Sequence, residues 1–222
     1  VIVVNTHLYG LNVASGGAIL PDHDVVVFDE AHVLEDIMSD TVGVEIAPGR
    51  FTALSGIVRR ILDDPRLVGS IAEIAEGLRD ALTPHVGNRL STPLPDSVQE
   101  VLTDARLRLG RANETLVAID TKNEDAKQRR LRAQTMTGRA IEQLDIAIEG
   151  GEGYVAFVSG SGEAPRLAVA PLDVGPAMTV GVWSLRTAIL TSATIPSSLA
   201  ARVGIAPDSV DVADVGSPFD YE

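Results

Sequence analysis

The amino-acid sequence predicts an α/β fold interrupted by an all-α insertion of four helices, and three observations support this. Short apolar runs, each followed by polar or turn residues, occur near both ends, as in VIVV at 1–4 and VVVF at 25–28. Between 48 and 150, apolar residues instead recur at spacings of three and four, which is typical of helices. Alternating patterns return after 151. We therefore expect an α/β part made of 1–47 and 151–222, with a helical insertion between them.

The first α/β segment is read as strand, helix, strand, helix and strand. VIVV and VVVF are predicted to be strands buried on both faces, because they are continuous apolar runs. HLYGLNVASGG at 7–17 predicts a short helix that ends at its two glycines. AHVLEDIMSD at 31–40 predicts a further helix, and TVGVEI at 41–46 alternates as a strand does.

Four helical patterns fill the insertion. Their apolar positions run over 51–62, 67–82, 98–116 and 126–148. The stretch TPHVGNRLSTPLPDS, with three prolines and a glycine, separates the second pattern from the third. These segments predict a helical bundle of about 100 residues.

The last part of the chain contains a predicted hairpin and a further strand. YVAFVSG at 154–160 and PRLAVAPL at 165–172 flank the turn signal SGSGEA. TAILTSAT at 187–194 is another apolar run, and it ends in small hydroxyl residues.

Composition limits the possible functions. The chain of 222 residues contains no cysteine, which excludes disulfides, thiol nucleophiles and thiolate metal sites within it and fits a reducing, cytoplasmic compartment. No apolar run reaches the roughly 18 residues that a membrane span needs. The net charge is −13, yet residues 106–139 hold nine of the 18 Lys and Arg residues against four acids. A polyanion would therefore be expected to bind that window and not the rest of the chain.

Asp29 and Glu30 are the most informative residues, because they place two adjacent carboxylates directly after VVVF. Open α/β sheets bind their ligands at the carboxyl ends of the strands. In nucleotide hydrolases a strand-end Asp holds Mg²⁺ beside the phosphates, and a neighbouring Glu can activate water. Two other interpretations stay open: the acids cap the following helix, or His32 and Glu35 form part of a metal site.

Thr191, Ser192 and Thr194 form a second candidate group, at the end of the TAIL run. Hydroxyl residues in such a place could cap a helix. Taken together with the acids after VVVF, they instead suggest a second part of the same site.

VVVFDEAH followed by AILTSAT resembles motifs II and III of superfamily-two helicases. VVNTHLYGLN, APLDVG and GSPFDYE are similar to further segments of the DinG and XPD branch. The resemblance implies a RecA-like (P-loop NTPase) motor domain, carrying the DEAH box in 1–47 and the TSAT motif in 151–222, interrupted at 48–150 by an Arch-like insertion. It also implies ATP hydrolysis coupled to translocation on single-stranded DNA in repair or replication, with the remaining helicase domains on the same polypeptide.

The resemblance assigns a role to each motif residue. Asp29 would coordinate Mg²⁺, and Glu30 would activate water for attack on ATP. His32 would couple the nucleotide site to Thr191, Ser192 and Thr194. An iron–sulfur cluster, where the family has one, is held by cysteines before the DEAH box, so this cysteine-free chain would not hold it.

The 222 residues lack a P-loop, G-x-x-x-x-G-K-[ST], because neither Lys122 nor Lys127 follows a glycine. This segment alone is therefore expected not to hydrolyse ATP. The basic window supplies the candidate contacts to single-stranded DNA, although a solvated helix face is the alternative. The candidates are Arg108, Arg111, Lys127, Arg129, Arg130 and Arg132.

Two rival functions remain at this point. One is a non-catalytic module that binds nucleic acid or protein and keeps the helicase scaffold. The other is a metal-dependent hydrolase, which would need more ligands than His32 and Glu35 supply.

Overall fold

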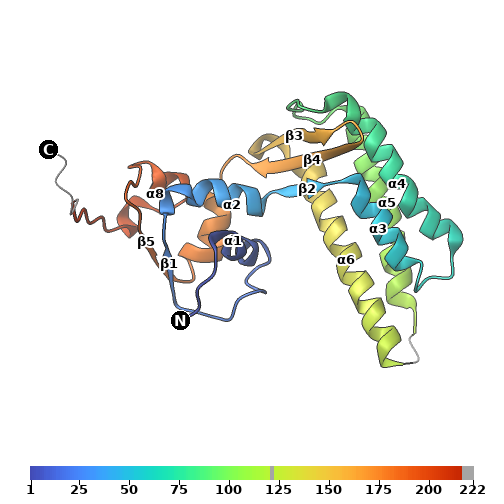
Figure 1. Cartoon of the computed structure of the whole chain (residues 1–222), viewed down its shortest axis with the longest axis horizontal. Helices are drawn as coiled ribbons and strands as arrows, with labels where there is room; N and C mark the ends of the chain where they lie inside the picture. The colour runs from blue at the N-terminus through green and yellow to red at the C-terminus, as the bar shows by residue number, and fades with distance from the viewer. Residues whose placement is uncertain (121–122, 217–222) are drawn as a thin grey trace. The chain divides into compact units, whose positions relative to one another are not determined.

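The structure, a computed structural model, describes residues 1–120 and 123–216 and is mixed α/β with a small parallel sheet (Figure 1). Lys122 and the segment SPFDYE lie outside the described residues. The chain divides into two compact units, Val1–Val42 with Asp173–Glu222 (unit 1) and Gly43–Leu172 (unit 2).

Unit 1 is built on a pair of parallel strands, β1 (Val25–Phe28) and β5 (Thr187–Leu190), in register from Val25 opposite Thr187 to Phe28 opposite Leu190. Helices and short turns surround Phe28 on one face of this pair and form the core. They are α1 (Thr6–Ala14), η1 (Ala31–Val33), α2 (Leu34–Val42), α7 (Gly175–Met178), η4 (Thr179–Trp183) and α8 (Leu199–Arg202). The short turn η5 (Pro207–Ser209) follows them and buries no residue.

The expected burial of both β1 faces is wrong. Val25 and Val27 are 54% and 59% exposed, whereas Phe28, on the other face, is buried. Successive strand residues point to opposite faces, and the core covers only one of them. The VIVV run is not a strand either, because among the described residues β1 pairs with β5 alone and no strand pairs with 1–4.

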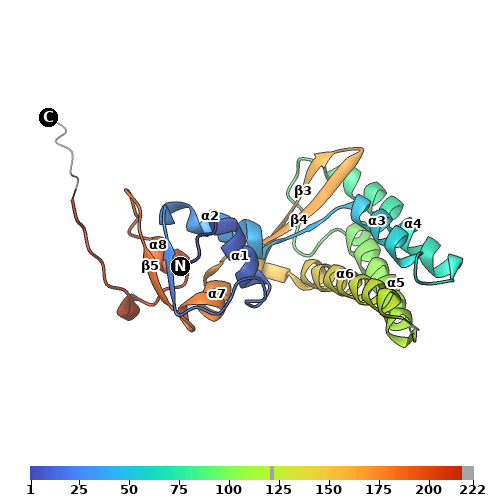
Figure 2. The ribbon, with the colours of Figure 1, turned by 60° about the horizontal axis from the view of Figure 1, so that its bottom comes forward.

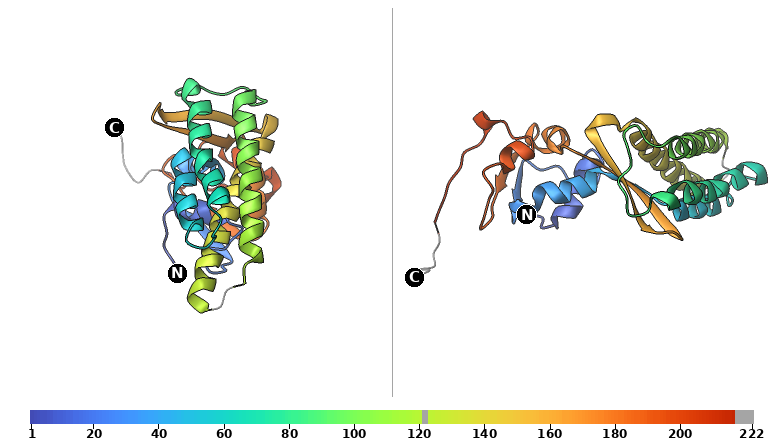
Figure 3. Two further views of the ribbon diagram at one scale, coloured as in Figure 1. Left: turned by 90° about the vertical axis from the view of Figure 1, so that its right-hand side faces the viewer. Right: turned by 90° about the horizontal axis from the view of Figure 1, so that it is seen from above.

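Unit 2 contains the expected four-helix bundle (Figure 3). Along the third helix, six residues from Val98 to Leu116 are fully buried, in the three-and-four spacing that predicted a helix. The cap residues Asp64 and Asn123 accept hydrogen bonds from the first turns of the second and fourth helices. The helices are α3 (Pro48–Val58), α4 (Pro65–Leu82), α5 (Asp96–Ala118) and α6 (Glu124–Glu149).

A three-stranded antiparallel sheet belongs to the same unit (Figure 2). β2 (Val44–Ile46) pairs with β4 (Ala164–Pro171), which pairs with β3 (Tyr154–Ser161). One face of this sheet joins the bundle core through residues such as Ile46 and Leu167. The compact inserted unit therefore spans 43–172 and not the expected 48–150, because the predicted strand at 41–46 and the hairpin bury their apolar residues against the bundle. The short turn η2 (Thr83–His85) follows α4, and the short turn η3 (Gly151–Gly153) follows α6.

No helix in the described part of the chain combines the length and apolar character that crossing a membrane requires.

Candidate active site at the strand ends of unit 1

The candidate site lies where β1 and β5 end, because the carboxyl ends of parallel neighbours meet at one edge of the sheet. The backbone pairing continues past both strands. Thr191 donates its amide hydrogen to the Phe28 carbonyl, and Ala31 donates to the Thr191 carbonyl, each with an N···O distance of 2.9 Å. The two sequence segments that carry candidate residues are thereby held side by side.

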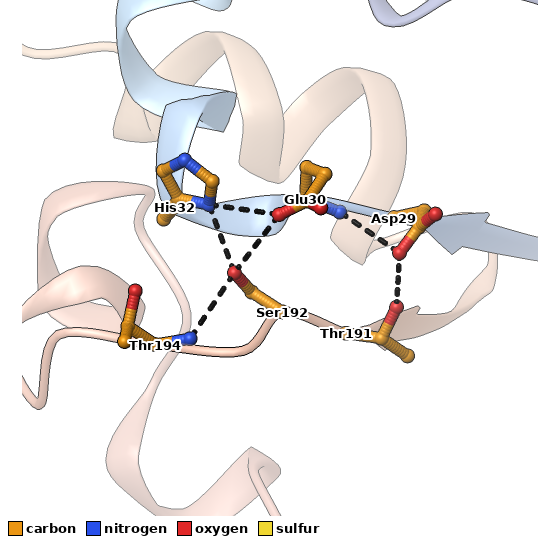
Figure 4. Close-up of polar contacts among 6 residues, drawn as sticks. All are labelled: Asp29, Glu30, His32, Thr191, Ser192 and Thr194. Carbon is orange, nitrogen blue, oxygen red and sulfur yellow. Dashed lines mark hydrogen bonds and ion pairs between the residues drawn. The ribbon is translucent and has the colours of Figure 1, made fainter.

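Asp29 makes its contacts through one carboxylate oxygen. Its Oδ1 accepts a hydrogen bond from the Thr191 hydroxyl at 2.9 Å and another from the Glu30 amide at 3.0 Å. The second oxygen points away from these partners in Figure 4. Asp29 is thus fixed in orientation while Oδ2 stays available to a ligand.

Glu30 turns the chain. Its backbone is left-handed, with φ 52° and ψ 43°, and it is the one non-glycine residue with positive φ in 1–120 and 123–216. This conformation costs roughly 1–2 kcal/mol for a residue with a Cβ. In an extended strand, neighbouring side chains would face opposite ways. The turn instead brings the carboxylates of Asp29 and Glu30 to the same β5 segment, where they contact Thr191 and Ser192.

His32 and Ser192 complete the cluster (Figure 4). His32 Nδ1 lies 2.8 Å from Ser192 Oγ and 3.2 Å from Glu30 Oε2. The Ser192 hydroxyl donates to Glu30 Oε2 at 3.4 Å and accepts from the Thr194 amide at 3.4 Å. Because a carboxylate only accepts, the shared Nδ1 is a donor, and the three side chains form a closed triangle.

This triangle differs from the catalytic triad of a serine hydrolase. A triad needs the nucleophile on one ring nitrogen and the carboxylate on the other. Here Ser192 and Glu30 both contact Nδ1. The arrangement positions Glu30 and His32 but gives Ser192 no general base.

The helix-cap interpretations of both motifs are wrong. Glu30 precedes η1 but provides no side-chain cap bond, and Asp29 accepts only from its own neighbour and from Thr191. After β5 the next helix starts at Leu199, beyond the TSAT segment. The hydroxyl and carboxylate groups therefore contact one another and not helix termini.

A metal site made from His32 and Glu35 is also wrong. Glu35 forms an ion pair with Arg202 instead. No group of three or more His, Asp or Glu residues in the described chain is arranged to hold a metal ion.

The cations of the basic window do not form one surface. Arg108 lies between Glu73 at 2.8 Å and Asp104 at 2.7 Å, and the Asp104 hydrogen bond raises the pKa of its guanidinium against the lowering effect of burial. Arg130 Nη1 lies 3.3 Å from the Leu116 carbonyl at the end of α5. Arg108 thus links α5 to α4, and Arg130 links α6 to α5.

The remaining candidates lie on the outer faces of α5 and α6. Lys127 is only 3.7 Å from Glu124, and Arg129 Nε lies 3.3 Å from the Asp125 carbonyl within its own helix. Arg111 and Arg132 form no ion pair with any described carboxylate. These four side chains are the ones able to contact a phosphate.

Three structural roles elsewhere in unit 1 were not predicted from the sequence. Asn5 caps α1 by accepting from the Leu8 amide at 2.8 Å, whereas His7 is exposed on that helix. The buried Asn12 accepts from two backbone amides, and Tyr9 contacts His23. A polar residue directly before an apolar-periodic segment is a cap signal that could have identified Asn5.

Comparison with protein-family models finds no matching family, and comparison with curated proteins finds no matching relative.

Proposed function

We propose that this chain is the central part of an ATP-dependent DNA helicase of the DinG and XPD type. Unit 1 would be part of a RecA-like motor domain and unit 2 its Arch-like insertion. The observation that carries the proposal is the direct contact of DEAH and TSAT residues across 162 positions of sequence, by Asp29 with Thr191 and by Glu30 with Ser192. ATP hydrolysis would drive translocation on single-stranded DNA in repair or replication.

Asp29 is the residue proposed to hold Mg²⁺. Mg²⁺ in nucleotide sites is bound through one or two carboxylates, with phosphates and water completing its shell. One oriented carboxylate with an unengaged oxygen fits this pattern. The metal would supply charge neutralisation at the phosphates of ATP.

Glu30 is the residue proposed to activate water. Its side chain is 64% exposed, so it can reach a ligand, and its contacts with His32 and Ser192 limit its orientation. A carboxylate can accept a proton from water that lies within hydrogen-bond distance. The αL backbone at Glu30 turns its side chain toward Ser192, and strained backbone of this kind clusters at functional sites.

His32 is proposed to link the two motifs. Through Nδ1 it contacts Glu30 and Ser192, and Ser192 accepts from the Thr194 amide. A change in the charge near Glu30 would therefore alter the contacts that hold the loop after β5. This loop would carry the nucleotide state to the DNA-moving parts.

ATP binding requires a phosphate-cradling loop, and the 222 residues contain none. The proposal places that loop in the remaining helicase domains of the same polypeptide. The decisive experiment therefore uses the polypeptide that carries this segment together with a P-loop.

In that polypeptide, Glu30→Gln should retain ATP binding and lose ATP hydrolysis, because only the proton acceptor is removed. Asp36→Asn is the matched control, since Asp36 is an exposed acid of α2 in the same unit. Nucleotide affinity and turnover would be measured for both. Normal turnover by Glu30→Gln, or the absence of any P-loop from the polypeptide, would refute the motor proposal.

A non-catalytic binding module is the second candidate function. One observation favours it: unit 2 carries an apolar pocket whose lining includes Arg50, and none of the strand-end residues belongs to that unit. If a polypeptide that lacks unit 2 hydrolysed ATP normally, the binding role of unit 2 would be separate from the motor.

A further inference from the structure

The seam between α3 and α6 in unit 2 differs from the other seams of the bundle. Consecutive helices pack along much of their length, α3 on α4, α4 on α5 and α5 on α6, whereas α3 and α6 meet over a short stretch (Figure 1). A pocket opens at this seam, with residues of β2, α3 and α6 around it. Its lining residues are Ile46, Arg50, Phe51, Ala53, Leu54, Met136, Ala140 and Gln143.

The pocket has an apolar floor. Ile46, Phe51 and Leu54 are almost fully buried and belong to the core of unit 2, so the floor is fixed by packing. Met136 is 37% exposed at its edge. Methionine adapts its shape to varied partners and recurs at surfaces that bind apolar side chains.

The one charged side chain in the pocket lining is a cation, Arg50, in a protein of net charge −13. Arg50 uses Nη1 to donate to the Glu45 carbonyl. Arg139 lies one turn beyond Met136 on α6, and α3 contains Arg50 but no acid. In the described part of the chain, neither Arg50 nor Arg139 has a carboxylate within ion-pair distance.

We propose that the α3–α6 pocket is a docking site for an acidic amphipathic helix of a partner protein. An apolar anchor of that helix would enter between Phe51 and Met136, and its flanking carboxylates would face Arg50 and Arg139. Helices bind grooves in this way through apolar residues spaced by three and four. Single-stranded DNA fits less well, because bases bind by stacking on exposed aromatic rings and Phe51 is 4% exposed.

A displayed library of helix-forming peptides of about 15 residues would be selected on the 222-residue chain. We expect enrichment of sequences with Leu, Ile or Phe at helical spacing and Asp or Glu beside them. Affinities of the enriched peptides would then be measured by fluorescence anisotropy. A library from which nothing is enriched, or from which basic peptides are enriched, overturns the proposal.

Two variants with matched controls test the location. Met136→Glu should weaken peptide binding by about tenfold or more, because a charge would replace an apolar contact at the centre of the interface. Leu131→Glu is the control, because Leu131 is similarly exposed (41%) on another side of the same helix. Arg139→Glu should also weaken binding, and Arg79→Glu on the exposed face of α4 should not.

Circular dichroism of each variant would establish that the bundle is folded. Equal losses for Met136→Glu and Leu131→Glu would overturn the proposed location. An oligo-dT of about 15 nucleotides serves as the competing ligand. Oligo-dT binding that Met136→Glu abolishes would assign the pocket to nucleic acid and overturn the peptide proposal.

Discussion

Thr191 donates its hydroxyl hydrogen to Asp29 Oδ1 at 2.9 Å, although 162 positions of sequence separate the two residues. The contact exists because β1 and β5 are parallel neighbours and each residue directly follows its strand. It is the shortest hydrogen bond between side chains of the two motifs apart from that of His32 with Ser192.

Replacing Thr191 with Val should lower the free energy of unfolding of unit 1 by about 1 kcal/mol. The substitution keeps the side-chain shape and removes a hydrogen bond to a charged acceptor, whose value is reduced by solvent exposure. Denaturant unfolding can be followed by the fluorescence of Trp183, the single tryptophan of the chain, which packs against Phe28 in unit 1.

Thr194→Val is the matched control, because only the backbone amide of Thr194 contacts the described cluster. We expect little change in stability from it. A similar loss in both variants would show that β propensity or solvation, and not the Asp29 contact, sets the effect.

The meeting of the two motifs could be predicted from sequence, since both follow apolar runs and strand ends gather at one edge. The four bundle helices could be predicted for a similar reason: their apolar spacing is regular over many turns. The number of buried faces of VVVF could not be predicted, because a continuous apolar run looks the same in the sequence whether one face of the strand is covered or both are. Val27 is exposed only because nothing in the described structure packs on that face.

The geometry at Glu30 could not be read from the sequence either. A left-handed glutamate has no residue signal, since glycine or asparagine is the usual marker of that conformation. The roles of Arg108 and Arg130 were hidden for a different reason. Whether an arginine faces a phosphate or a neighbouring helix depends on which face of α5 or α6 it occupies.

Two Gly→Ala substitutions should have opposite effects on stability. In Gly10→Ala the new Cβ would overlap the hydroxyl of Thr41, so α1 and α2 would have to separate. We expect unit 1 to be destabilised by about 1–3 kcal/mol, the usual cost of overpacking. Unfolding followed by Trp183 fluorescence would measure it.

Gly110→Ala is the matched substitution in an unobstructed place, because a Cβ at this position on α5 would meet nothing within 4 Å. It should stabilise unit 2 by about 0.5–1 kcal/mol through lower backbone entropy in the unfolded chain. Helical circular dichroism during unfolding would report it. Destabilisation by Gly110→Ala would contradict the open surface of α5.

Charge reversal at Arg129 and Arg132 should weaken binding of single-stranded DNA and flatten its salt dependence. Removing one phosphate contact should reduce the slope of log K against log salt by about 0.7. Anisotropy titrations of labelled oligo-dT over a range of salt concentrations would measure the slope. Arg130 is left unchanged, because its contacts with the Leu116 and Val117 carbonyls make it part of the bundle.

The control for this DNA experiment is Arg79→Glu. Arg79 lies on α4, and this substitution changes the net charge as much as each of the other two substitutions does. It should leave the slope unchanged. Equal affinity and slope in wild type and the Arg129, Arg132 variant would establish the basic window as a solvated face.

Tyr9 should ionise above the ordinary pKa of 10.0, because burial raises the pKa of its phenol, although the positive charge of Arg186 partly offsets this. His23 Nδ1 donates to the Pro21 carbonyl at 2.8 Å, so Nε2 is free to accept the Tyr9 hydroxyl at 2.9 Å. The native state thus holds the phenol proton more tightly than the unfolded chain does. The difference in pKa between the two states contributes to the free energy of unfolding. This contribution is fully present below pH 10.0, and it is lost as the pH rises through the native pKa of Tyr9.

Replacing Tyr9 with Phe therefore has two measurable consequences. Tyrosinate absorbance of wild type minus that of Tyr9→Phe should titrate above pH 10.0, and the variant should lose less stability than wild type at alkaline pH. The variant should also be less stable near neutral pH, because His23 Nε2 loses its donor while the ring contact with Phe28 remains. A difference titration at or below pH 10.0 would contradict this prediction, since the charge of Arg186 would then balance or outweigh the effect of burial on the phenol.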